Sequence, residues 1–113
     1  MSSNNNVITA STFTRNRASH GGAIYVYTSN NRIGDCTFNR NNATAEGGAI
    51  FIGYLATNQI LNKLTVANST ANDGGAIFVY ASKVNITDSL INGNLALNRG
   101  AGVVIKRICN VYF

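Results

Sequence analysis

The sequence predicts an all-β fold: a right-handed, single-stranded parallel β-helix of four rungs plus the start of a fifth, each rung being one full circuit of the coil. Three observations predict it. One short phrase recurs at a nearly constant period, a second phrase precedes each copy at fixed internal spacing, and apolar residues alternate with polar ones in runs too short for helices.

The recurring phrase is Gly-Gly-Ala-Ile, which begins at Gly21, Gly47 and Gly74, with a diverged copy, Gly-Ala-Gly-Val, at Gly100. These first glycines are 26, 27 and 26 residues apart. A fixed period of this size indicates one supersecondary unit stacked on itself. The repeat therefore decides the architecture before any single element is assigned.

The second phrase places two apolar residues, an Asn or Ser and an Ala at constant spacing. Its four copies span residues 8–18, 33–43, 61–71 and 86–96. A fifth copy begins at Ile108 and stops at Phe113, as if the chain were an excerpt of a longer array. We expect residues 1–6 to be a disordered polar N-terminus and residues 7–113 to form the coil, with rungs starting near residues 7, 32, 60, 84 and 107.

Each copy reads as strands and turns. Its apolar residues alternate over four to six positions, and no window of ten residues shows helical spacing. Gly and Asn, which tolerate left-handed backbone angles, punctuate the copies, and Pro is absent. About 26 residues suit one coil of three short strands and three turns.

Residues at equivalent positions should stack about 4.8 Å apart, which is the ordinary strand spacing. Four apolar columns are therefore expected to face inward and form one continuous core. They comprise Ile24, Ile50, Ile77 and Val103; Val26, Ile52, Val79 and Ile105; Ile8, Ile33, Leu61, Ile86 and Ile108; and Phe13, Phe38, Val66, Ile91 and Phe113.

Two further columns are expected at the bends. Stacked amides at Asn16, Asn41 and Asn94 could bond the turn backbone and each other, with Ser69 taking the third place. A second bend falls at the glycine pairs, where a Cβ would clash. Those residues are Gly21, Gly22, Gly47, Gly48, Gly74 and Gly75.

Aromatic residues alternate with the inward columns of the glycine phrase. If Ile24 and Val26 point in, the rings point out and form a strip that could bind a sugar or another protein. The strip comprises Tyr25, Tyr27, Phe51, Phe78 and Tyr80. In the alternative, reversed register these rings are core.

The position before each glycine pair holds His20, Glu46, Asp73 and Arg99. Carboxylates on neighbouring rungs have a separation that glycoside hydrolysis could use, so Glu46 and Asp73 define an enzymatic alternative. The simpler interpretation pairs His20 with Glu46 and Asp73 with Arg99. We expect no enzyme, no metal site and no cofactor, because no further catalytic or ligand pattern accompanies these residues.

The net charge of +5 comes from nine basic residues spread over 113, so nucleic-acid binding is not expected. Cys36 and Cys109 fall too far apart to pair within one chain. We expect neither a signal peptide nor a membrane span within this segment. Its bare strand edges make end-to-end self-association an expectation.

The paired phrases, Phe-x-x-Asn at residues 13–16 and 38–41 and Gly-Gly-Ala-Ile at residues 21–24, 47–50 and 74–77, resemble the repeats of chlamydial polymorphic outer membrane proteins. The resemblance covers residues 7–113. It departs at Val66 and Ser69 and at the Gly-Ala-Gly of rung four. It implies a right-handed β-helix used as the exported passenger of an autotransporter, displayed on a cell surface or outer membrane and engaged in adhesion.

The expected function is therefore structural display, with outer faces of the coil binding glycans or proteins of host or neighbouring cells. Two alternatives stay open. One is a remnant of a polysaccharide-cleaving β-helix enzyme that uses Glu46 and Asp73, and the other is a spacer without a ligand.

Overall fold

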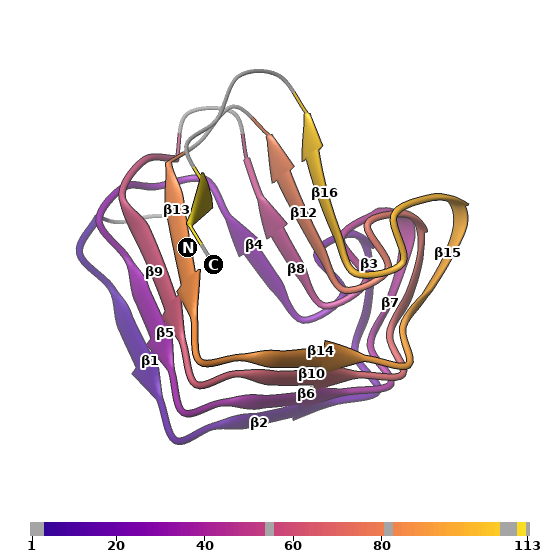
Figure 1. Ribbon diagram of the computed structural model, residues 1–113, viewed down its shortest axis with the longest axis horizontal. Helices are drawn as coiled ribbons and strands as arrows, with labels where there is room; N and C mark the ends of the chain where they lie inside the picture. The colour runs from indigo at the N-terminus through magenta and orange to yellow at the C-terminus, as the bar shows by residue number, and fades with distance from the viewer. Residues whose placement is uncertain (1–3, 54–55, 81–82, 107–110, 113) are drawn as a thin grey trace.

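The computed structural model describes residues 4–53, 56–80, 83–106 and 111–112, and these residues form seventeen short strands and no helix. The described part of the chain therefore contains no helix long and apolar enough to cross a membrane. Every strand pairs in parallel with its equivalent one rung away, which makes a β-solenoid (Figure 1). The strands follow one another anticlockwise in Figure 1 as the chain rises toward the viewer, so the coil is right-handed.

Four parallel sheets form the sides of the coil. The first contains β1 (Val7–Thr9), β5 (Arg32–Gly34), β9 (Gln59–Asn62), β13 (Val84–Thr87) and β17 (Val111–Tyr112). The second contains β2 (Thr12–Thr14), β6 (Thr37–Asn39), β10 (Thr65–Ala67) and β14 (Leu90–Asn92). The third contains β3 (Arg17–His20), β7 (Asn42–Glu46), β11 (Thr70–Asp73) and β15 (Leu95–Arg99). The fourth contains β4 (Ile24–Val26), β8 (Ile50–Ile52), β12 (Ile77–Tyr80) and β16 (Val103–Lys106).

A rung thus has four strands and four corners, and the expectation of three strands and three turns is wrong. The expectation failed because each rung contains up to four residues with left-handed backbone angles, one at each corner. One corner holds Ala10, Asp35, Lys63 and Asp88, the next Arg15, Arg40, Asn68 and Gly93, the third Gly21, Gly47, Gly74 and Gly100, and the fourth Asn5, Asn30 and Asn58, all with positive φ. The first corner gives a weak signal in the sequence, because Ala10 and Lys63 are residue types that seldom adopt a positive φ.

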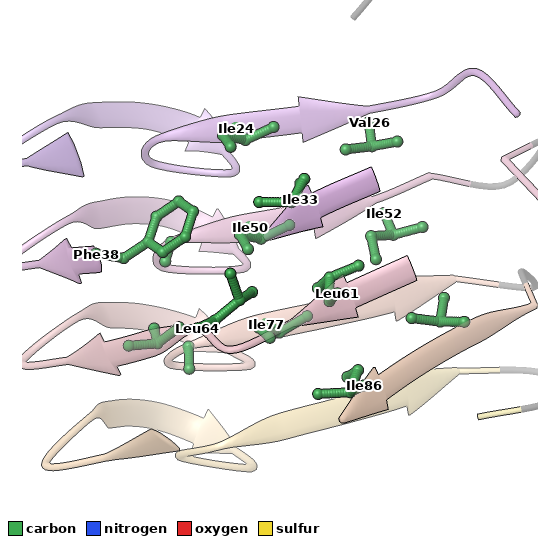
Figure 2. Packing of buried hydrophobic residues seen from close by; sticks show 14 of the residues in the cluster. Ile24, Val26, Ile33, Phe38, Ile50, Ile52, Leu61, Leu64, Ile77 and Ile86 are labelled. Carbon is green, nitrogen blue, oxygen red and sulfur yellow. The ribbon is translucent and has the colours of Figure 1, made fainter. Parts of the chain in front are cut away.

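The predicted columns stack in register. Ile24 lies opposite Ile50, Ile50 opposite Ile77 and Ile77 opposite Val103, and the other inward columns align in the same way. Figure 2 shows these side chains meeting inside the coil. Ile33, Phe38, Ile50, Ile52, Leu61, Val66, Ile77 and Val79 are fully buried in one core cluster. Ile108, Cys109 and Phe113 and the side chain of Ile105 lie outside what the structure describes.

The asparagine column forms the expected ladder at the second corner. The Asn41 side-chain oxygen accepts from the backbone N–H of Asn16 at 3.0 Å, and its amide donates to the carbonyl of Phe13 at 3.0 Å. Asn94 repeats both bonds two rungs later, to Ser69 and Val66. These bonds satisfy backbone groups that the bend removes from sheet pairing.

The second glycine of each pair is required by a close backbone approach. A Cβ on Gly48 would overlap the carbonyl oxygen of Gly75 on the next rung and lie 2.9 Å from the backbone of Thr70. Gly22 and Gly75 face the same obstruction from their own neighbours. The glycine corner is therefore closed by neighbouring rungs as well as by its own conformation.

Gly48→Ala should destabilise the fold by about 3 kcal/mol, because the added methyl group must displace backbone rather than a side chain. Gly34→Ala is the matched control, since its Cβ would meet nothing nearer than 3.6 Å. Urea unfolding followed by circular dichroism measures both. Equal midpoints for the two variants would contradict this explanation of the glycine pair.

Candidate functional site

Four polar residues end the strands of the third sheet and form one column across the rungs. His20 lies opposite Glu46, Glu46 opposite Asp73 and Asp73 opposite Arg99 in the parallel register. The glycine corner follows at once and reverses the chain into the fourth sheet. We call these four residues the polar column.

The five aromatic residues of the predicted strip lie on the face of the fourth sheet opposite the core, because they alternate with the buried Ile and Val residues. The rings of Tyr25 and Phe51 stack at a centroid distance of 4.9 Å, and those of Phe51 and Phe78 at 5.5 Å with planes 6° apart. Tyr27 meets Tyr25 at 66°, and Tyr80 stacks beside Phe78. We call these five residues the aromatic ladder.

The polar column and the aromatic ladder form one surface, which the sequence alone did not show. The ring of His20 meets that of Phe51 edge-on at 5.0 Å and that of Tyr25 at 6.3 Å. The glycine corner lies against the ladder as well, since a Cβ on Gly74 would be 3.1 Å from the Cβ of Phe78. The reversal at the glycines thus brings both sets of residues together.

This arrangement corrects the expectation that the whole strip is exposed. Tyr25 and Tyr27 are 42% and 49% exposed, but Phe51 is only 7% exposed and Phe78 is completely buried. Stacking covers the ring faces of the two phenylalanines, and the ring of His20 packs edge-on against Phe51. A partner can therefore reach the tyrosine pair of rung one and the half-buried Tyr80, whereas Phe51 stacks against Tyr25 and Phe78 against Tyr80.

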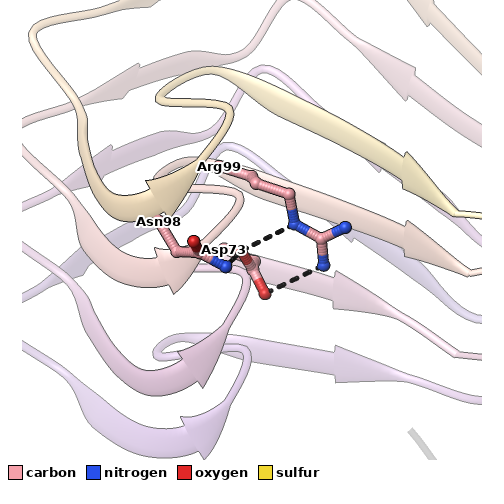
Figure 3. Close-up of polar contacts among 3 residues, drawn as sticks. All are labelled: Asp73, Asn98 and Arg99. Carbon is pink, nitrogen blue, oxygen red and sulfur yellow. Dashed lines mark hydrogen bonds and ion pairs between the residues drawn. The ribbon is translucent and has the colours of Figure 1, made fainter.

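Asp73 is held by a fixed set of donors in the polar column. Arg99 donates to both carboxylate oxygens at 3.1 and 3.2 Å, and the Asn98 amide adds a bond of 3.0 Å (Figure 3). The hydrogen bond and the charge of Asp73 raise the pKa of Arg99 above its ordinary value, and Glu46 adds a smaller contribution. The expected Asp73–Arg99 pair is confirmed, although Asp73 is buried rather than facing solvent.

The second expected pair also forms, with His20 Nε2 3.7 Å from Glu46 Oε2. Glu46 and Asp73 lie opposite each other on adjacent strands, as the enzymatic alternative requires. However, both oxygens of Asp73 are bonded to Arg99 or Asn98, so this carboxyl is not placed to protonate a leaving group or attack a sugar. No three His, Cys, Asp or Glu side chains gather at metal-binding distance within the described ranges.

Sequence reasoning missed a second ladder of polar side chains, at the fourth corner. Asn31 accepts from the backbone and side chain of Asn6, both at 2.9 Å, and Gln59 donates to the carbonyls of Thr28 and Thr57. Asn31 and Gln59 are almost fully buried. The sequence does contain a signal for this second ladder, because Asn6, Asn31 and Gln59 recur at close to the repeat period.

Comparison with known families agrees with the repeat pattern. Two segments, residues 10–27 and 35–53, match the family model described as the Chlamydia polymorphic membrane protein repeat. The first two rungs are therefore similar to polymorphic membrane protein repeats. The unmatched third and fourth rungs stack on them in register, and they carry the departures at Val66, Ser69 and the Gly-Ala-Gly phrase. No curated protein and no solved structure matched the chain in the other two comparisons.

Arg99→Ala should lower the urea midpoint, because the buried Asp73 carboxylate would keep only the amide of Asn98 among these three donor bonds. A buried acceptor that loses its partners costs about 1–3 kcal/mol. Asp73→Asn combined with Arg99→Ala should recover part of this loss, since the charge is then removed. Arg17→Ala, an exposed arginine on β3, is the control. Identical midpoints for Arg99→Ala and Arg17→Ala would show that the pair has no structural role.

Proposed function

We propose that this segment belongs to a surface-displayed, adhesin-like passenger and binds glycans or proteins of host or neighbouring cells through outer faces of the coil. Two findings support the proposal. The first two rungs match the Chlamydia polymorphic membrane protein repeat, and the solenoid displays its outer side chains on a rigid scaffold. The parent protein is then expected at the cell surface or outer membrane as the passenger of an autotransporter.

The observation that carries the proposal is the exposed tyrosine pair. Tyr25 and Tyr27 together present two partly exposed phenol rings, and stacking on Phe51 fixes the position of Tyr25. Tyrosine suits such a contact because it offers apolar area and a hydroxyl group at small cost in side-chain entropy. The site is therefore a patch on rung one rather than a strip along all rungs.

Adhesion through such a patch depends on many copies. A contact of two side chains is weak, but dense display on one cell surface makes the later contacts effectively intramolecular. The rigid coil fixes where each patch points. The segment would then contribute one weak contact among many.

The test uses beads coated with the full chain and applied to cultured cells. Tyr25→Ala combined with Tyr27→Ala should weaken bead binding about tenfold or more, because an anchoring tyrosine contributes about 2 kcal/mol to a contact. Leu90→Ala removes an exposed apolar side chain from the second sheet and should leave binding unchanged. Circular dichroism checks that the tyrosine variant stays folded.

Unchanged adhesion of the folded tyrosine variant would overturn the role of this patch. Phe78→Ala is a useful third variant, since Phe78 is fully buried in the ladder. It should lower both the urea midpoint and bead binding, because it removes the ring that stacks on Phe51. A residue that only contacts the partner would lower binding and leave the midpoint unchanged.

A further inference from the structure

A small hollow lies on a different side of the coil, where the fourth corner leads into the first sheet. Asn58, Gln59, Ile60, Lys83 and Asn85 line it, and its volume is about 150 Å³. It lies between rungs three and four, since these residues belong to the starts of β9 and β13 and to the segments just before them. The tyrosine patch is on the fourth sheet of rung one, so the two sites have no residue in common (Figure 1).

The hollow carries a positive charge that no Asp or Glu of the described residues neutralises. Lys83 is exposed and makes no ion pair with any residue that the structure describes. No Asp or Glu is among the residues that line the hollow. The backbone beneath is fixed, because the carbonyl of Lys83 accepts from the N–H of Gln59 at 2.9 Å. An ammonium group in this setting attracts an anion.

Two amide side chains supply hydrogen-bond donors beside the Lys83 ammonium group. Asn58 donates one hydrogen to Asn30 at 3.1 Å, and no second partner is found for its amide within the described part of the chain. Asn85 is exposed on β13 and lies opposite Ile60 in the parallel register. Gln59 is different, since both of its amide hydrogens are used by Thr28 and Thr57, so it fixes the corner rather than meeting a ligand.

The size and the lining select the class of ligand. A complete small-molecule site usually occupies about 300–1,000 Å³, so this hollow accommodates a single group of a larger molecule. The side chain of Ile60 is 45% exposed and supplies an apolar surface beside the donors. A cation, two amides and one aliphatic side chain suit a charged sugar, which presents an anionic group, hydroxyls and a C–H face together.

We propose that this hollow is a subsite for the carboxylate or sulfate group of an acidic glycan. Lys83 pairs with the anionic group, Asn58 and Asn85 bond its oxygens or the adjacent hydroxyls, and Ile60 contacts the sugar ring. The proposal rests on the proposed function only for the source of the glycan, a cell surface. Nucleic acid fits less well, because the single lysine that lines the hollow does not offer several phosphate contacts.

Nuclear magnetic resonance titration of the full, ¹⁵N-labelled chain tests the proposal. The probe is a heparin-derived tetrasaccharide, with maltotetraose as the neutral control and sodium sulfate at equal ionic strength as the free-anion control. The side-chain amide signals of Asn58 and Asn85 should shift with the heparin fragment and stay in place with maltotetraose. Lys83→Met should weaken this binding about tenfold, as expected for loss of a charged hydrogen bond.

Lys63→Met is the matched control, because Lys63 is an exposed lysine at the opposite end of the first sheet. It should leave the titration unchanged. Equal weakening by both lysine variants would show a general charge effect and overturn the subsite. Equal affinity for free sulfate or for a hexaglutamate peptide would overturn the assignment to a glycan.

The same titration separates this proposal from the tyrosine patch. The Tyr25→Ala and Tyr27→Ala variant should bind the heparin fragment as the unmodified chain does. Adhesion lost with these tyrosines while glycan binding at Lys83 persists would support both sites. Absence of any shift at Asn58 and Asn85 would overturn the subsite and leave the tyrosine patch standing.

Discussion

The structure depends on one constraint: each residue must stack on its counterpart one rung away, at the strand spacing of about 4.8 Å. Every strand described pairs only with the equivalent strand of a neighbouring rung. No rung can bury its own apolar side chains, so the core exists only as columns shared between rungs. Ile, Val and Leu can therefore replace one another within a column, but a polar side chain, or one that points out of the coil, cannot take their place.

The corners obey the same constraint through different chemistry. At the second and fourth corners, buried amides bond backbone groups of the adjacent rung, so the ladders of Asn41 and Asn31 connect rungs rather than residues of one turn. At the third corner, glycine allows backbone to touch backbone. That close corner also turns the polar column against the aromatic ladder, so the geometry of the candidate site is a consequence of the glycine pair.

The sequence predicted the fold, the inward columns, the Asn ladder and both charge pairs because each is a property of repeated spacing. It failed where a feature depends on how consecutive sides of the coil meet. Ala10 and Lys63 adopt left-handed backbone angles that their residue types do not predict, which hid the fourth side of the coil. Phe51 and Phe78 point away from the core as alternation predicts, yet they are buried, because rings of neighbouring rungs stack against them. The hollow at Lys83 joins the starts of two rungs, so no single copy of the repeat contains it.

The stacked register is tested most directly by nuclear Overhauser contacts between methyl groups of Ile24, Ile50 and Ile77, labelled in the full chain. The structure predicts contacts from Ile24 to Ile50 and from Ile50 to Ile77, which are neighbours in register, and none from Ile24 to Ile77, which are two rungs apart. A direct contact between Ile24 and Ile77, or contacts that indicate a shifted pairing, would contradict the coil described above.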